Sequence, residues 1–200
     1  MNPANMEIPA QTTGVDGSVL YYGKLDSPHA VHFFLELRDR GSAHVMESLL
    51  DSVREGADAG KYVVKFHFNG AFDDTVGGSG SHRALSALGA AADAGQNAFA
   101  DYLAALFKAQ PFPPGYDRFA EADTLLTAAD SVAGLRSADF DRKVNEGTYL
   151  QWAGKAIADF ESYGVIGTPI AWYDDNDIHV FTVPDGPAVS PQDFLAELHD

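Results

Sequence analysis

The sequence contains no cysteine among its 200 residues. That absence excludes disulfide bonds, thiolate metal sites and every reaction that needs a thiol nucleophile. It also removes one indication of cellular compartment, because disulfides persist mainly in oxidising environments. Any chemistry at a site of this chain must therefore use other side chains.

Basic residues are scarce, with 13 Lys and Arg against 29 Asp and Glu and a formal net charge of -16. Proteins that bind nucleic acid or anionic membranes need clustered Lys and Arg, so neither partner is expected. No apolar run approaches the roughly 20 residues of a membrane span. Residues 1–17 show neither the basic nor the apolar region of a signal peptide, so the sequence predicts a cytoplasmic protein.

Hydrophobic residues make up 46% of the chain and aromatic residues 12%, which is enough for a sizeable core. Residues 1–17 are polar and lack any hydrophobic period, so they are expected to form a flexible N-terminus. The rest of the chain, residues 18–200, has a length that suits one domain.

Two apolar runs near the start, residues 30–37 and 61–68, are typical of buried central strands. Between them, apolar residues recur at helical spacing from Ser42, which is a natural N-cap. A strand, helix, strand unit predicts a right-handed crossover and two parallel strands. Residues 18–22 add a shorter strand before this unit.

A helical period dominates from residue 77 to residue 147 and predicts an all-helical insertion before the sheet resumes. The expected helices of the insertion span residues 81–93, 96–109, 120–132 and 138–146. A further helix is expected at 149–163. After it, strands at 170–173 and 178–183 should form a hairpin, and Ser190-Pro191 should open the last helix.

The turn at Thr168-Pro169 separates the helix at 149–163 from the following strand. Proline at the start of a strand loses no ladder hydrogen bond, and only an X-Pro bond adopts the cis form at modest cost. We therefore expect a cis bond before Pro169.

This order of elements predicts an α/β protein with a thioredoxin fold, in which a central mixed sheet is flanked by helices and carries an all-helical insertion. Three segments, residues 23–34, 106–110 and 163–169, resemble the bacterial DsbA-like (thioredoxin-4) family of the thioredoxin superfamily. The last segment is similar to the family's Gly-Val-x-Gly-Thr-Pro signature, in which the proline is cis. The resemblance covers most of the chain.

The family's Cys-x-x-Cys motif falls on Asp39, Arg40, Gly41 and Ser42, and neither end of it is a thiol. The resemblance implies that position 39 holds the nucleophile, activated by the helix N-terminus. A carboxylate there interacts with the same helix dipole but cannot exchange disulfides. The buried acid that assists proton transfer in many relatives corresponds to Phe33. We therefore expect a retained scaffold without thiol-disulfide chemistry.

Other catalytic sites find little support. Asp39, Ser42 and His44 are the residue types of a hydrolytic triad, but residues two apart on a helix do not face each other. His44 and Glu47 supply only two metal ligands, whereas a site needs three or four. No catalytic residue and no metal site are therefore predicted.

Three further patterns have structural interpretations. His32 and His67 should lie on neighbouring strands as core histidines. Residues 174–177 lack the glycine and the terminal glutamate of a calcium-binding loop, so they predict a hairpin turn. The glycine-rich residues 77–80 lack the Gly-Lys of a phosphate-binding loop.

Binding at the family's site remains as the leading hypothesis. In the thioredoxin fold, the helix start at Ser42 faces the loop before the cis-proline. Free N–H groups there and the chain edge at Thr168 suit an extended peptide or a small anion. The sequence thus predicts a redox-inactive protein that binds a peptide or small molecule, without a cofactor, through Asp39, Arg40, Gly41, Ser42, Thr168 and Pro169.

Two alternatives stay open. The first is an enzyme resembling the kappa-class glutathione transferases and related isomerases, which use glutathione and a serine near this helix start. That serine commonly occupies the first motif position, where Asp39 would repel a thiolate. The second is a purely structural or complex-forming module. The sequence identifies neither the ligand nor the oligomeric state.

Overall fold

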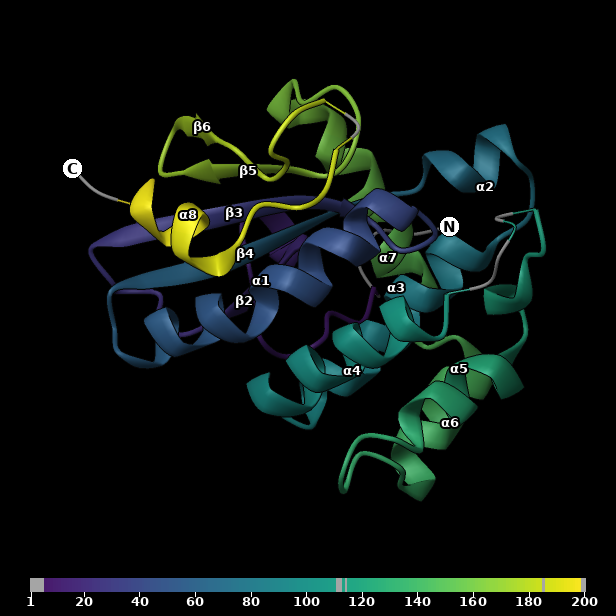
Figure 1. The fold of residues 1–200 in the computed structure, drawn as a ribbon. Helices are drawn as coiled ribbons and strands as arrows, with labels where there is room; N and C mark the ends of the chain where they lie inside the picture. Colours follow the sequence, from purple (N-terminus) through teal and green to yellow (C-terminus); the bar gives the residue numbers. More distant parts are fainter. Residues whose placement is uncertain (1–5, 111–112, 114, 185, 199–200) are drawn as a thin grey trace.

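The computed structural model describes residues 6–110, 113, 115–184 and 186–198 (Figure 1). Its centre is one mixed sheet with the strand order β1-β2-β4-β3-β5-β6. The strands are β1 (Thr12–Thr13), β2 (Val19–Tyr22), β3 (His29–Glu36), β4 (Tyr62–Asn69), β5 (Ile170–Tyr173) and β6 (Asn176–Ile178). Helices cover both faces of this sheet, as the predicted α/β class requires.

The parallel pair β3 and β4 forms the middle of the sheet. The long helix α1 (Arg40–Asp58) connects the two strands, and Phe34 on β3 lies opposite His67 on β4. Both strands are buried over most of their length, which explains their continuous apolar sequences. The predicted strand, helix, strand unit is therefore confirmed.

The two faces of β3 contact different helices because side chains alternate along a strand. Phe33 stacks on Phe194 of the short helix α8 (Pro191–Ala196), with ring centroids 5.7 Å apart. Phe34 points the other way and meets Phe160 of α7 (Leu150–Phe160), also at 5.7 Å. The sheet is thus enclosed between α7 on one face and α1 with α8 on the other.

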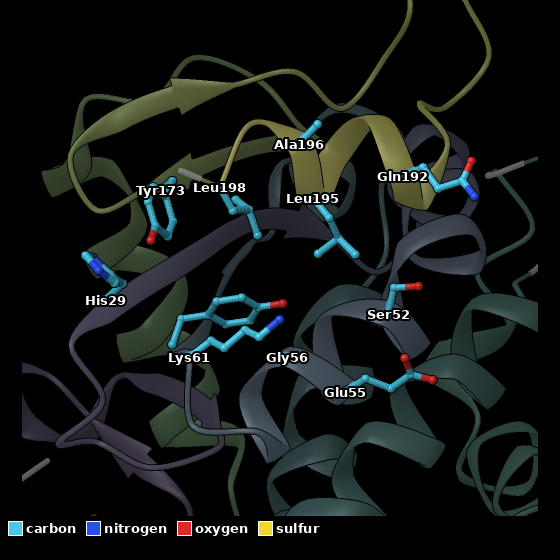
Figure 2. A pocket seen from close by; sticks show the side chains of 11 residues that line it. His29, Ser52, Glu55, Gly56, Lys61, Tyr173, Gln192, Leu195, Ala196 and Leu198 are labelled. Atoms are coloured by element: carbon cyan, nitrogen blue, oxygen red, sulfur yellow. The ribbon is translucent and has the colours of Figure 1, made fainter. Parts of the chain in front are cut away.

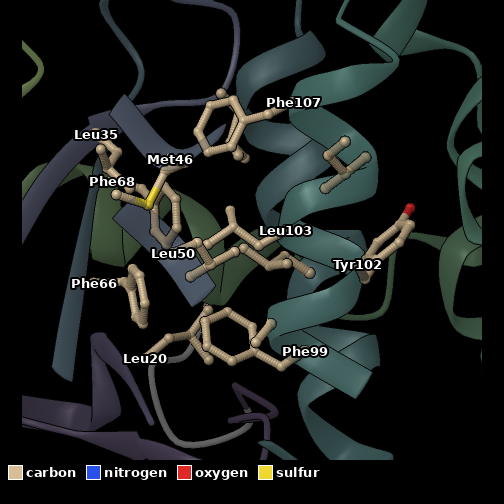
Figure 3. Packing of buried hydrophobic residues seen from close by; sticks show 14 of the residues in the cluster. Leu20, Leu35, Met46, Leu50, Phe66, Phe68, Phe99, Tyr102, Leu103 and Phe107 are labelled. Carbon is tan, nitrogen blue, oxygen red and sulfur yellow. The ribbon is translucent and has the colours of Figure 1, made fainter. Parts of the chain in front are cut away.

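The helical block between β4 and β5 contains α2 (Ala71–Thr75), α3 (Gly80–Asp93), α4 (Gln96–Lys108), α5 (Ala122–Ala129) and α6 (Ala138–Glu146). Its four long helices lie within a few residues of their predicted bounds, whereas α2 was not predicted. Phe99 of α4 contacts Phe66 of β4 edge to face, with the ring centroids 5.3 Å apart. Figure 3 shows side chains of α4, α1 and the sheet in one hydrophobic cluster.

The N-terminal segment departs from its prediction as a flexible terminus. Thr12 and Thr13 pair with β2, and a 3₁₀ turn, η2 (Val15–Gly17), follows. The carbonyl of Gly17 accepts the indole N–H of the buried Trp152 at 2.7 Å. Backbone pairing orders this segment without an apolar period, so the prediction is wrong for residues 12–17. Residues 1–5 lie outside the described part of the chain.

The C-terminal hairpin forms with a different register from the predicted one. Tyr173 pairs with Asn176, so the turn consists of two residues, and β6 ends at Ile178. The predicted strand at 178–183 is therefore wrong. Asp174 takes a left-handed conformation (φ 51°), which lets the chain reverse this tightly. Beyond the hairpin, Ser190 caps α8 and Pro191 opens it, as predicted. Across the described ranges, no helix has the length and hydrophobicity to cross a bilayer.

Candidate functional site

The first turn of α1 is capped by Asp39, and the prediction of Ser42 as the N-cap is wrong. Asp39 Oδ1 accepts the N–H of Gly41 at 3.1 Å, and Oδ2 accepts the N–H of Ser42 at 2.8 Å. A carboxylate stabilises a helix start because it satisfies orphan N–H groups and lies at the positive end of the dipole. The helix consequently begins at Arg40.

Ser42 lies behind this cap and is fully buried. Its Oγ donates to Asp39 Oδ2 at 2.7 Å and accepts the backbone N–H of Glu36 at 3.1 Å. Ser42 therefore joins the last residue of β3 to the cap of α1, which holds the strand end and the helix start in a fixed relation.

The loop before β5 lies against the same turn. The Thr168–Pro169 bond is cis, and Thr168 Oγ1 donates to Asp39 Oδ2 at 3.4 Å. A Cβ atom at position 41 would lie 3.0 Å from Pro169 Cδ, so Gly41 permits this close approach. The structure thus brings the predicted site residues together, with Arg40 on the exposed side of the turn.

The site nevertheless differs from its prediction in one respect that bears on ligand choice. The sequence predicts free N–H groups at the start of α1, yet those of Gly41 and Ser42 both donate to Asp39. The negatively charged carboxylate of Asp39 already occupies the start of α1, so a second anion is disfavoured there. The prediction that the N–H groups of Gly41 and Ser42 are free is therefore wrong.

Gln110 supports the site from the helical insertion. Its Nε2 donates to the carbonyl oxygens of Leu37 at 2.9 Å and Asp39 at 3.0 Å. These bonds hold the connection between β3 and α1. Gln110 belongs to the segment 106–110 that carries part of the family resemblance, but the sequence assigned it no role.

A buried ion pair lies beneath the same connection. The side chain of Arg38 is fully buried, and its guanidinium lies 2.8 Å from Asp73 Oδ1 and 3.4 Å from Asp117 Oδ1. It also donates to the carbonyl of Gly77 at 3.1 Å. Burial alone would raise the pKa of Asp73, but hydrogen bonds from Ser81 and its other donors outweigh burial and lower it. Arg38 thereby connects the site to α2 and to the loop that follows it.

Glu36 is the second buried charge that the sequence did not reveal. It is 1% exposed, its Oε2 accepts the backbone N–H of Arg38 at 2.6 Å, and its Oε1 accepts the hydroxyl of Ser81. Burial, reinforced by the charges of Asp39 and Asp73, raises the pKa of Glu36 to about 7. The one indication of this buried charge in the sequence was a glutamate within a predominantly apolar run.

Glu36→Gln is expected to flatten the dependence of stability on pH. Because its folded pKa lies above the ordinary value of 4.5, Glu36 contributes stability below about pH 4.5 that is lost as pH rises through 7. Glutamine is neutral at every pH, so the variant should gain about 2 kcal/mol relative to wild type between pH 5 and pH 8. Urea unfolding at both pH values measures this difference.

The matched control is Glu161→Gln, at an exposed position. Its stability curve should run parallel to that of the wild-type protein. A parallel curve for Glu36→Gln as well would show that Glu36 is ionised in both states and would contradict the prediction.

His32 and His67 form a pair on the α7 side of the sheet. His32 Nδ1 lies 2.9 Å from His67 Nε2, and the rings stack with centroids 5.2 Å apart. Burial is the main cause that lowers the pKa of His32 to about 4 and that of His67 to about 3. Both rings are therefore neutral near pH 7, as expected of core histidines.

Comparison with known proteins agrees with this architecture. A search of curated protein sequences found no match. The structure is similar to MdbA, a thiol-disulfide oxidoreductase from Actinomyces oris, with a TM-score of 0.75 and 15% identity over 98% of this chain and 89% of that one. It is also similar to BdbD from Bacillus subtilis, with a TM-score of 0.66 and 18% identity over 87% of this chain and 90% of the other.

A third similar structure is DsbA from Mycobacterium tuberculosis, with a TM-score of 0.68 and 17% identity over 91% of each chain. At such identities the likeness establishes the fold. The sequence model of the Thioredoxin_4 family, described as thioredoxin, matches residues 16–183. The chain therefore belongs to the Thioredoxin_4 family, as a DsbA-like member that has lost the cysteine motif.

Proposed function

We propose that this protein is a redox-inactive member of its family that binds an extended peptide between the start of α1 and the loop before β5. Thiol-disulfide exchange requires a thiolate, and the chain has none. The scaffold that positions the site is nevertheless complete, from the cap at Asp39 to the loop that ends in Pro169. Binding is the function that such a site can perform without a thiol.

The backbone of residues 165–168 is the observation that carries this proposal. Within the described part of the chain, the N–H groups of these residues donate no hydrogen bond, and sheet pairing starts only at Ile170. Extended peptides add to unpaired backbone beside a sheet through main-chain hydrogen bonds. The loop therefore offers a template for one short extended segment.

Side chains around the loop favour a particular kind of peptide. Ile166 is 93% exposed, which is unusual for a large apolar residue beside a polar turn. Asp39, partly exposed on the opposite side, carries a negative charge, and the whole chain has a net charge of -16. A peptide with an apolar residue over Ile166 and a basic residue towards Asp39 fits this arrangement.

Selection from a random library of twelve-residue peptides on the immobilised protein is expected to enrich such sequences. A selected peptide should raise the melting temperature, because a ligand that binds only the folded state stabilises it. Ile166→Ser should weaken binding about tenfold through the loss of apolar contact area. Calorimetric titration measures the affinity.

Leu25→Ser is the matched control, since Leu25 is also exposed (50%) and lies at the other end of β3. It should leave the affinity unchanged. Equal binding by wild type, Ile166→Ser and Leu25→Ser would refute the proposed site. Glutathione in the same assay tests the transferase-like alternative. If glutathione raises the melting temperature and no peptide does, the transferase-like alternative replaces the proposal.

A further inference from the structure

A cavity with a volume of about 950 Å³ lies at the end of the sheet farthest from Asp39. It is bordered by α1, by α8, and by the starts of β3 and β4 (Figure 2). Cavities of about 300 to 1,000 Å³ are the usual size for small-molecule sites. Nothing in the proposed peptide site involves this region.

The wall of the cavity is apolar towards α8. Leu195 and Leu198 come from this helix and its end, and Tyr173 comes from β5. In Figure 2, Leu195 points from α8 into the space above Lys61. Such a wall suits the hydrocarbon or aromatic body of a ligand.

A buried hydroxyl without a partner belongs to the same wall. Tyr62 is 3% exposed, and its hydroxyl has no hydrogen-bond partner among the described residues. It lies where Gly56 has no side chain, since a Cβ atom at position 56 would be 2.0 Å from the hydroxyl oxygen. Burial raises the pKa of Tyr62 to about 12, so the hydroxyl keeps its proton at neutral pH. An unsatisfied buried donor of this kind calls for an acceptor.

Lys61 adds a positive charge to the rim. It is exposed and forms no ion pair within the described ranges, although acidic residues outnumber basic ones 29 to 13 in this chain. Glu55 makes the α1 side of the rim acidic. An anionic group is therefore favoured on the side of Lys61 and disfavoured on the side of Glu55.

We propose that this cavity binds an amphipathic carboxylate, whose apolar body lies against Leu195 and Leu198. The carboxylate accepts a hydrogen bond from the Tyr62 hydroxyl and pairs with the Lys61 ammonium. A monocarboxylate with a medium-length alkyl chain has this chemistry and fits within the cavity volume.

Decanoate, 1-decanol and decylammonium, each below its micelle concentration, are the probes for this site. The three share one alkyl chain and differ in head group. Non-specific attraction to a chain of charge -16 would favour decylammonium. The proposal predicts the opposite order, with decanoate bound about tenfold more tightly than decylammonium in calorimetric titrations. Equal affinity of the two, or no binding of decanoate, would overturn it.

Tyr62→Phe removes only the hydroxyl. Because that hydroxyl has no protein partner, the variant should fold with a melting temperature at least as high as that of wild type. Its affinity for decanoate should fall about tenfold, while its affinity for 1-decanol should fall less. An unchanged decanoate affinity in the folded variant would contradict the proposal.

Lys61→Gln provides an independent test at an exposed position, with an expected threefold to tenfold loss of decanoate affinity. Lys65→Gln is its control, because it removes the same charge from β4 outside the cavity. If both lysine variants lose the same decanoate affinity, the loss is due to net charge alone, and the proposed site is refuted. The alternative occupant of this surface is a second copy of the chain. It would be supported if sedimentation showed self-association, if Leu195→Asp blocked that association, and if decanoate did not bind.

Discussion

A variant with cysteine at positions 39 and 42 is expected to form an intramolecular disulfide and to gain a thiol-disulfide activity that the natural chain lacks entirely. Asp39 Oδ2 and Ser42 Oγ lie 2.7 Å apart, so the two side chains already meet in the first turn of α1. The helix N-terminus should lower the pKa of a thiol at position 39 below its free value of about 8.5. Position 39 is partly exposed and position 42 is buried, so the outer thiol should be the nucleophile.

The disulfide is detected by mass, as the loss of two hydrogens after mild oxidation, and the activity by insulin reduction. The activity should be weak, because Phe33 provides no proton acceptor at the position where many relatives carry an acid. Removing the Asp39 cap should also cost about 1 kcal/mol of stability. The single variant Asp39→Cys is the control and should form no intramolecular bond. Two thiols that both stay free in a folded, oxidised protein would show that these positions are not the motif positions.

Arg38→Met is expected to reduce the free energy of unfolding by about 3 to 5 kcal/mol. Arg38 is fully buried against Asp73, so its removal leaves a buried carboxylate without its counter-charge. The double variant Arg38→Met with Asp73→Asn should recover part of this loss, since it removes both charges. Urea denaturation of the two variants measures both effects.

Arg142→Met is the matched control. Arg142 forms two ion pairs, with Asp139 and Glu146, but it lies on the exposed face of α6. Surface ion pairs contribute little to stability because water and salt screen them. The control should therefore unfold close to wild type. If Arg38→Met also unfolds close to wild type, the buried pair is not a source of stability, and the prediction fails.

The sequence predicted those parts of the fold whose signal is local. The continuous apolar runs indicated β3 and β4, and helical spacing indicated α6, whose bounds match the structure. β1 was not predicted, because Thr12 and Thr13 are ordered by backbone pairing with β2, which leaves no hydrophobic pattern in the sequence. The first turn of α1 was misassigned because Asp39 and Ser42 are both good caps, and only the fold decides between them.

The candidate site shows a similar division. The resemblance to the family placed the motif positions and the proline loop, because both lie in short segments that can be compared along the chain. The groups beneath them were missed, since Glu36, Asp73 and Ser81 come from a strand and two different helices and meet only in three dimensions. No local rule couples residues so far apart in the chain, and only the presence of charge within an apolar strand hinted at Glu36.

The cap formed by Asp39 has a consequence for how the proposed peptide would leave the site. A thiol motif alternates between a reactive and a bonded form, so its charge and its hold on a bound chain change during each catalytic cycle. The carboxylate of Asp39 keeps the same bonds to Gly41, Ser42 and Thr168 in the presence of peroxide, glutathione or an alkylating agent. Under the proposed function, release of the bound peptide would therefore be governed by its dissociation rate and by competition, and the occupancy of the site would report peptide concentration rather than redox state.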